Sequence, residues 1–246
     1  MEANGMHKGD MKKQAILDTA EKLFFEKGYR DTSVQDILDR LHCSKGSFYH
    51  HYESKLQVLM EICRQKAKKN FETYLDSEYK NELEQLNGLI YQAMPFNKEG
   101  EEMLAVLLPL EGLSDGQMVL QSVIDAQKEY FYPEMEALLA VLKGKGVLHY
   151  YQEFLPMLLW DAYTACYGKL MQEAAALKNG GTTQNVIQII DAARFMWERL
   201  TDAPFGSLEL IRADEALQSI NHAIFRIRRI ESENNVQPAE EAEVEE

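Results

Sequence analysis

Residues 32–52 decide the fold of the N-terminal region, and they read TSVQDILDRLHCSKGSFYHHY. In the first half of this stretch, apolar residues recur at helical spacing, which predicts a helix over 33–41. In the second half, a serine precedes a run that can form another helix over 44–51. Only His42 and Cys43 are left to connect the two. Two short helices joined by so tight a turn are typical of a helix-turn-helix unit.

Capping signals extend this unit in both directions. Towards the N-terminus, apolar positions predict a helix over 11–27 that ends at Gly28, a residue suited to a left-handed cap. Thr32 and Gln35 fit a capping box at the start of helix 33–41. Towards the C-terminus, Ser54 with Gln57 fits a second capping box, which opens a helix over 54–76.

The helix over 44–51 has two different faces. Phe48 and Tyr52 are spaced to anchor one face in a core. The other face offers hydrogen-bonding or cationic side chains: Lys45, Ser47, Tyr49 and His50. A recognition helix that enters a DNA groove needs this combination of an apolar anchor and a polar edge. A small helical bundle with an exposed polar face has the same pattern, so the pattern alone leaves both interpretations open.

The residues in this region carry a family resemblance. Ile16 to Phe24 (ILDTAEKLF), Lys27-Gly28-Tyr29, Thr32-Ser33-Val34, Ser44 to Tyr52 (SKGSFYHHY) and Ser54-Lys55 together resemble the DNA-binding domain of the TetR family of transcriptional repressors. The resemblance covers about residues 11–60 and is specific in order and spacing. The rest of the chain resembles that family only in length and helical character.

The resemblance implies roles for individual residues. It implies phosphate contacts from Ser33, Tyr49 and Lys55, and contacts at or near base edges from Lys45, Gly46, Ser47 and His50, with Ser44 in the same DNA-binding set. The chain departs from the family pattern in the turn, where His42 replaces the usual Gly and Cys43 the usual Val. Histidine can adopt the left-handed conformation at modest cost, so we expect the turn to form.

Composition and charge set the class of protein. The chain has 246 residues, 46% of them apolar and 27% charged, which is typical of a globular protein of one large or two smaller domains. No apolar run could span a membrane or serve as a signal-peptide core, so we expect no membrane association and a cytoplasmic location. The net charge is −14, yet residues 1–55 are neutral, and half of the excess lies in the segment 231–246. An acidic total therefore does not exclude DNA binding.

No signal points to catalysis, a metal or a cofactor. The three cysteines, Cys43, Cys63 and Cys166, are too scattered for a disulfide framework or a paired-Cys zinc site. Adjacent His50 and His51 point in different directions on a helix and cannot easily share an ion. Nucleophile motifs and phosphate-binding loops are absent, so we expect no enzyme activity.

The middle of the chain is rich in aromatic residues and methionines, most of which we expect in the core. The family resemblance implies a small-molecule pocket here, and the chemistry favours an uncharged, largely apolar effector. The candidate lining residues are Tyr91, Met118, Tyr130, Met135, Phe154, Trp160, Tyr163 and Tyr167. Pro109, Pro133 and Pro156 should kink or break helices around the pocket.

Narrow apolar stripes mark the last two predicted helices, over 184–201 and 207–230. Such stripes suit a helical bundle, either within one chain or between two copies. The candidate dimer-interface residues are Ile190, Trp197, Leu217, Ile220 and Ile224.

The sequence thus predicts an all-α protein of two domains: a helix-turn-helix DNA-binding domain over 10–56, a helical effector-binding and dimerisation domain over 57–230, and a disordered acidic tail over 231–246. The predicted function is a homodimeric repressor that binds a palindromic operator in double-stranded DNA and is released by a small molecule. The alternative is a helical ligand-binding or interaction protein that has lost specific operator binding because His42 misplaces the next helix.

Overall fold

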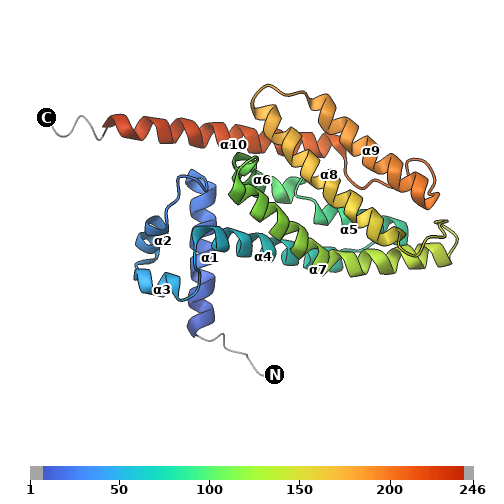
Figure 1. Cartoon of the computed structure of the whole chain (residues 1–246), viewed down its shortest axis with the longest axis horizontal. Helices are drawn as coiled ribbons and strands as arrows, with labels where there is room; N and C mark the ends of the chain where they lie inside the picture. The colour runs from blue at the N-terminus through green and yellow to red at the C-terminus, as the bar shows by residue number, and fades with distance from the viewer. Residues whose placement is uncertain (1–7, 241–246) are drawn as a thin grey trace.

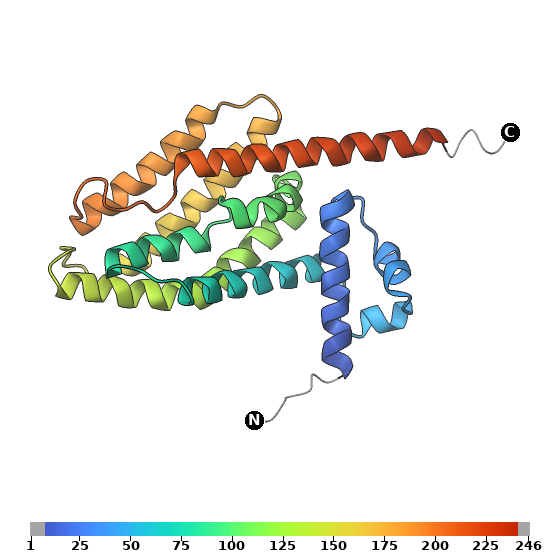
Figure 2. The same ribbon diagram turned by 180° about the vertical axis from the view of Figure 1, so that it is seen from behind.

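The computed structural model describes residues 8–240, and all regular secondary structure in this part of the chain is helical, with no strand. A small N-terminal domain lies at one end of a larger body (Figures 1 and 2). The small domain consists of α1 (Lys8–Lys27), α2 (Val34–Leu41) and α3 (Lys45–Tyr49). The predicted all-α fold with an N-terminal helix-turn-helix and a larger helical domain is confirmed.

The larger body is a layered bundle. Its helices are α4 (Lys55–Leu75), α5 (Glu82–Ala93), α6 (Glu101–Leu107), α7 (Ser114–Gly144), α8 (Leu155–Lys178), α9 (Thr183–Thr201) and α10 (Ala213–Glu240), with 3-10 turns η1 (Lys98–Gly100) and η2 (Leu108–Leu110) on either side of α6. Helix α7 packs against α4, α5 and α8, while α10 packs against α6 and α9. Figures 1 and 2 show that α4 runs from the small domain into the body.

Local signals decide how the small domain is built. Ile16, Ala20 and Phe24 of α1 are buried as predicted, and Gly28 ends that helix with a φ of 86°. The N-cap of α2, however, is Ser33 rather than Thr32. The Ser33 hydroxyl accepts a hydrogen bond from the Asp36 N–H, and the Asp36 carboxylate accepts one from the Ser33 N–H. Thr32 is buried instead, where its hydroxyl donates to the Gly28 carbonyl.

The C-terminal segment differs from the sequence prediction. Helix α10 continues to Glu240, so residues 231–240 are helical rather than disordered, while 241–246 lie outside the described residues. Contacts with the rest of the molecule explain why acidic composition did not prevent the helix: Lys178 pairs with Glu231, and the Asn234 amide donates to the Lys27 carbonyl. Pairing along the helix, between Arg229 and Glu233, adds support.

The prolines fall at different kinds of position. Pro133 lies inside α7 without breaking it. It is exposed, so the carbonyl one turn earlier, which loses its partner, can face water. Pro156 lies in the first turn of α8, where the missing N–H costs least, and Pro109 lies in η2. Within residues 8–240, no helix is long and apolar enough to cross a bilayer.

Candidate nucleic-acid interface and effector pocket

The turn between α2 and α3 is formed with histidine in the glycine position. His42 adopts the left-handed conformation with φ 49° and ψ 45°, and its N–H donates to carbonyls of the last turn of α2. The Cys43 N–H also donates to the Leu38 carbonyl, at 3.1 Å. These bonds satisfy carbonyls that a helix end would otherwise leave without partners. Replacement of the usual Gly therefore leaves the helix-turn-helix geometry intact.

One face of helix α3 packs against the core of the small domain, and the opposite face is exposed. Ser44 caps its start by accepting a hydrogen bond from the Ser47 N–H, and Phe48 is completely buried, with Tyr52 buried beside it. The opposite side carries Lys45, Gly46, Tyr49 and His50, all exposed, with Ser47 half-buried. Tyr49 is 47% exposed, which leaves its hydroxyl free to meet another molecule. The anchor and the polar edge expected of a recognition helix are thus both present.

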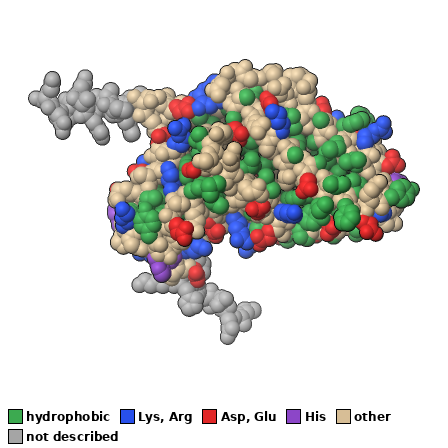
Figure 3. Space-filling model, viewed as in Figure 1, with side chains coloured by type: hydrophobic (Ala, Val, Ile, Leu, Met, Phe, Trp, Pro, Cys, Tyr) green, Lys and Arg blue, Asp and Glu red, His purple; other side chains and the backbone are tan. Residues whose placement is uncertain are grey.

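The charge of the exposed α3 face suits a polyanion. Lys45 is its cation, with its ammonium 5.9 Å from the Tyr49 ring centre, and His50 and His51 lie with their rings 5.0 Å apart. No carboxylate belongs to α3. Histidine side chains are visible at this end of the molecule in Figure 3. This face can therefore approach phosphate without like-charge repulsion from α3 itself.

The resemblance implies a phosphate contact for Lys55, but the Lys55 ammonium is bonded to groups within the protein. Its ammonium donates to the carbonyls of Tyr29 and Thr32, both at 2.6 Å, and lies 4.2 Å from the centre of the Tyr29 ring. Burial lowers the pKa of this ammonium, although Asp115, Asp31 and Asp36 act in the other direction. Lys55 therefore holds the connection between α1 and α2 rather than presenting its charge to solvent. Ser33, likewise, is engaged in capping α2.

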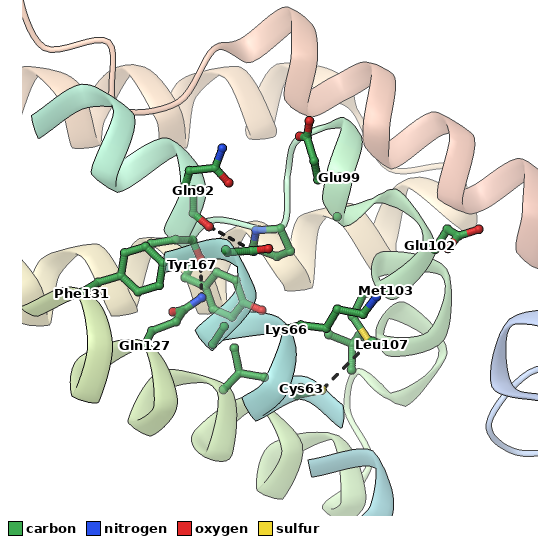
Figure 4. A pocket seen from close by; sticks show the side chains of 16 residues that line it. Cys63, Lys66, Gln92, Glu99, Glu102, Met103, Leu107, Gln127, Phe131 and Tyr167 are labelled. Carbon is green, nitrogen blue, oxygen red and sulfur yellow. Dashed lines mark hydrogen bonds between the residues drawn. The ribbon is translucent and has the colours of Figure 1, made fainter. Parts of the chain in front are cut away.

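A cavity of about 60 Å³ lies between α4, α5, α6, α7 and α8 (Figure 4). Its walls include Cys63, Met103, Leu107, Phe131 and Tyr167, with Gln127 as a buried polar group. The lining combines these apolar side chains with polar and charged residues, and five helices contribute to it. Lys66, Asn70, Gln92, Glu99 and Glu102 also lie at the cavity. That combination is typical of small-molecule sites in helical bundles.

The buried Gln127 side chain at the cavity uses only part of its hydrogen-bonding capacity. The Gln127 amide donates to the Ala93 carbonyl, but its own buried oxygen has no hydrogen-bond partner among the described residues. The Cys63 thiol is buried, and burial raises its pKa to about 12, so it remains a neutral thiol. A buried acceptor without a donor is costly, so a ligand or water that donates to Gln127 would be stabilised.

Most of the predicted effector-pocket residues lie elsewhere. Tyr167 lines the cavity, whereas Phe154 is 71% exposed and Met118 lies in a surface groove between α4 and α7. Met135, Trp160 and Tyr163 lie in the core and Tyr130 packs against it. Tyr91 is half-buried, and none of these residues lines the cavity. Aromatic density predicted burial but could not show which face of each helix meets the cavity.

Gln127 and Phe131 line the cavity but were not among the predicted pocket residues. A signal for both was present, because Val123, Gln127 and Phe131 recur every four residues on α7. A lone polar residue on such an apolar stripe is a candidate for an internal hydrogen bond or a ligand contact.

The predicted dimer-interface residues are mostly inside their own domain. Ile190, Trp197, Ile220 and Ile224 are buried, and Leu217 packs against the same core. The stripes are real, but they pack α9 on α8 and α10 on α6. The exposed apolar side chains lie on other faces, among them Met157 and Leu158 of α8 and Phe195 and Leu200 of α9. Figure 3 shows hydrophobic side chains gathered over the end of the body where α8 and α9 lie.

No group of three or more His, Cys, Asp or Glu side chains in residues 8–240 is arranged to hold a metal ion.

Comparison with known proteins places the N-terminal domain. Residues 16–62 match the model of a family described as bacterial regulatory proteins, tetR family. A stretch of 49 residues, 20% of this chain, is 47% identical to the HTH-type transcriptional repressor KstR2 of Rhodococcus jostii and covers 24% of that protein. Another relative is the uncharacterized HTH-type transcriptional regulator YuxN of Bacillus subtilis, with 38% identity over 71 residues, 29% of this chain and 24% of YuxN. The matched segment therefore spans about a quarter of these relatives.

Solved structures match over most of the chain. A TetR-family transcriptional regulator from Pectobacterium atrosepticum superposes with a TM-score of 0.60 at 18% identity, over 80% of this chain and 97% of the other. Salmonella enterica GusR gives a TM-score of 0.53 at 16% identity, over 81% and 100% of the two chains. At such identities the likeness concerns the fold alone. Residues 16–62 therefore form a DNA-binding domain of the tetR type, and the fold of the chain is similar to that of solved TetR-family regulators.

Proposed function

We propose that the protein is a ligand-responsive transcriptional repressor that binds a palindromic operator as a homodimer. The observation that carries the proposal is the build of α3, where a completely buried Phe48 holds an exposed edge of Lys45, Tyr49 and His50. Such an edge can contact phosphates and read base edges in the major groove. KstR2, a relative over the N-terminal domain, is described as a transcriptional repressor.

Selection from random DNA duplexes tests this function. We expect the selected duplexes to share a palindrome, and affinity for it to fall as salt rises. Lys45→Ala should weaken binding to all sequences alike, whereas Ser47→Ala should change the preferred bases, because the two side chains differ in what they can reach. Lys80→Ala, at an exposed position between α4 and α5 of the larger body, is the charge-matched control. Failure to enrich any palindrome would contradict the proposal.

The dimer would form through the exposed faces of α8 and α9. Met157 and Leu158 of α8 are exposed, as is Phe195 of α9, and α8 and α9 pack side by side. A two-fold axis across these faces would make an isologous four-helix contact. It would also present two recognition helices to the half-sites of one palindrome.

Charge placed on this face should separate the protomers. We expect Phe195→Glu and Leu158→Glu to give monomers in sedimentation at micromolar concentration, with helicity unchanged. Phe225→Glu, at a 73% exposed position of α10, is the matched control and should remain dimeric. Unchanged sedimentation of the two α8 and α9 variants would exclude this interface.

The effector would occupy the cavity lined by Phe131 and Tyr167. A volume of about 60 Å³ corresponds to about four water-sized sites, so the ligand is small or the cavity widens around it. Two of the charged lining residues, Lys66 and Glu102, already have partners of opposite charge, so the remaining apolar side chains favour an uncharged organic molecule. The Gln127 oxygen, which has no partner among the described residues, favours a ligand with a hydroxyl or N–H donor.

A thermal-shift screen of small hydrophobic alcohols and amides tests the effector site. If the cavity is the effector site, compounds that raise the melting temperature should also weaken operator binding, because an effector that releases DNA must bind the DNA-free conformation more tightly than the DNA-bound one. Val123→Phe fills the cavity and should abolish the shift, while Phe225→Ala, remote from it, should retain it. Compounds that stabilise the protein but leave operator affinity unchanged would show that the cavity is not a switch.

A further inference from the structure

The end of α1 is completed by side chains from the other end of the chain. The last carbonyls of a helix have no partner within the helix, so they need donors from elsewhere. At α1, the Arg226 guanidinium donates to the Phe25 carbonyl at 3.1 Å, and the Asn234 amide donates to the Lys27 carbonyl at 3.2 Å. Both donors belong to α10.

Further contacts fix α10 against the small domain. The same Asn234 amide donates to the Asp31 carboxylate at 2.9 Å, just beyond the end of α1. The Arg226 guanidinium also lies 5.5 Å from the Phe25 ring centre. A side chain added at Gly28 would meet Ile230 of α10, which is itself buried. In Figures 1 and 2, α10 lies along the body and reaches past the end of α1.

Arg226 connects this contact to the effector cavity. A second nitrogen of its guanidinium pairs with the Glu102 carboxylate of α6 at 3.0 Å. Glu102 and Met103 are neighbours in α6 and both line the cavity, but the Glu102 side chain points away from it (Figure 4). One face of α6 thus meets the cavity while Glu102 holds Arg226, so a displacement of α6 acts directly on the group that caps α1.

We propose that α10 is a clamp that sets the orientation of the DNA-binding domain through Arg226 and Asn234, and that the Glu102–Arg226 pair couples it to the cavity. The proposal rests on the proposed function. Helix α4 is the covalent connection between the domains, and α6 contacts α1 directly. The clamp is a further attachment, which α10 makes through side-chain hydrogen bonds. Arg226 and Asn234 are positioning residues, and the clamp holds the arrangement in which both recognition helices fit one operator.

The first test uses the selected operator and the full-length protein. Arg226→Gln and Asn234→Ala should each weaken operator affinity by about fivefold, and Glu102→Gln should act in the same direction. Arg229→Gln is the matched control, because it removes the same charge from the same helix but pairs only with Glu233 among the described residues. Equal affinities of the clamp variants and the wild type would overturn the proposal.

A second readout separates orientation from simple loss of stability. The clamp variants should tolerate changes in half-site spacing better than the wild type. When one base pair is added to or removed from the selected operator, the affinity of a clamp variant should fall by a smaller factor than the affinity of the wild type. Uniform weakening on all spacings, together with a lower melting temperature, would mean that Arg226 merely stabilises the domain and would overturn the clamp.

A third readout needs no DNA. Hydrogen exchange in the protein alone should become faster at the end of α1, around the Gly28 N–H that donates to the Phe24 carbonyl, in Arg226→Gln and in Glu102→Gln but not in Arg229→Gln. Unchanged exchange there would overturn the clamp. If the wild type selected no palindrome while this exchange pattern appeared, the repressor function would fail and the clamp would stand.

Discussion

The helix-turn-helix and the α8–α9 region are both marked by apolar stripes, but the two stripes mean different things. In the small domain, Phe48 faces the core and its neighbours Lys45 and Tyr49 remain exposed, as the pattern predicts. In α9, the stripe that looked suited to another subunit, including Ile190 and Trp197, is buried within its own domain. An apolar stripe shows that a face is covered, but it does not show by what.

The largest effect we expect comes from the buried α9 stripe. Trp197→Ala should lower the free energy of unfolding by about 3–5 kcal/mol. The Trp197 side chain is only 1% exposed, so its removal leaves a large void in the core. Urea unfolding of the variant measures this. Phe225→Ala, which is largely exposed, should change the same quantity by less than about 0.5 kcal/mol. If the two variants lost similar amounts of unfolding free energy, the α9 stripe would not be part of the domain core and would again be a candidate for contact with another subunit.

Two lysines of the small domain, Lys55 and Lys45, should differ in what they contribute. Lys55→Met should destabilise the protein by about 2 kcal/mol, because the Tyr29 and Thr32 carbonyls lose a charged donor in a half-buried site. Lys45→Met removes the same charge from an exposed position and should leave stability unchanged while weakening DNA binding. Thermal unfolding and DNA titration together separate the two lysines. The structural role of Lys55 would be refuted by a variant as stable as the wild type.

The cap of α2 gives a smaller, pH-dependent effect. Burial alone would raise the pKa of Asp36, but hydrogen bonds from Lys27 and Ser33 outweigh burial and lower this pKa from 3.8 to about 2. A lowered pKa in the folded state stabilises the protein above the unfolded pKa, and this stabilisation is lost as the pH falls from 3.8 towards 2. Asp36→Asn should therefore cost about 1 kcal/mol at neutral pH and progressively less across that window.

Chemical unfolding at several pH values checks the Asp36 prediction. Asp39→Asn is the control, since the Asp39 carboxylate is exposed and accepts a hydrogen bond only from the Gln35 side chain among the described residues. A difference between Asp36→Asn and the wild type that stays constant down to pH 2 would contradict the assignment.

The smallest effect has the opposite sign. His42 and Asp202 are the two non-glycine residues with positive φ in residues 8–240, at 49° and 51°. His42→Gly should stabilise the protein by about 0.5–1 kcal/mol by relieving left-handed strain. Asp202→Gly tests the same exchange in the larger domain, and both can be measured by melting temperature. Destabilisation by His42→Gly would mean that the imidazole makes a contact worth more than the strain.

How far the sequence predicts this structure depends on the range of the interactions. Ser44 and Gly28 were assigned correctly because capping and left-handed turns involve groups within a few residues. The Asn234 contact could not be predicted, because nothing near residue 234 indicates that the end of α1 is its partner. Tyr167 was among the predicted pocket residues, but Gln127 and Phe131 were not. Their four-residue spacing places them on one face of α7, yet only the packing of α4, α5 and α8 around that helix shows that this face meets the cavity.

The contact between α1 and α10 also has a consequence for biosynthesis. Arg226 and Asn234 follow their partners in the chain by 201 and 207 residues. Domains generally fold in the order in which they leave the ribosome, so the helix-turn-helix acquires its own core long before α10 exists. A nascent or prematurely terminated chain would therefore carry a finished DNA-binding domain with an open α1 end. Translation of the last helix is the step that fixes that domain in place.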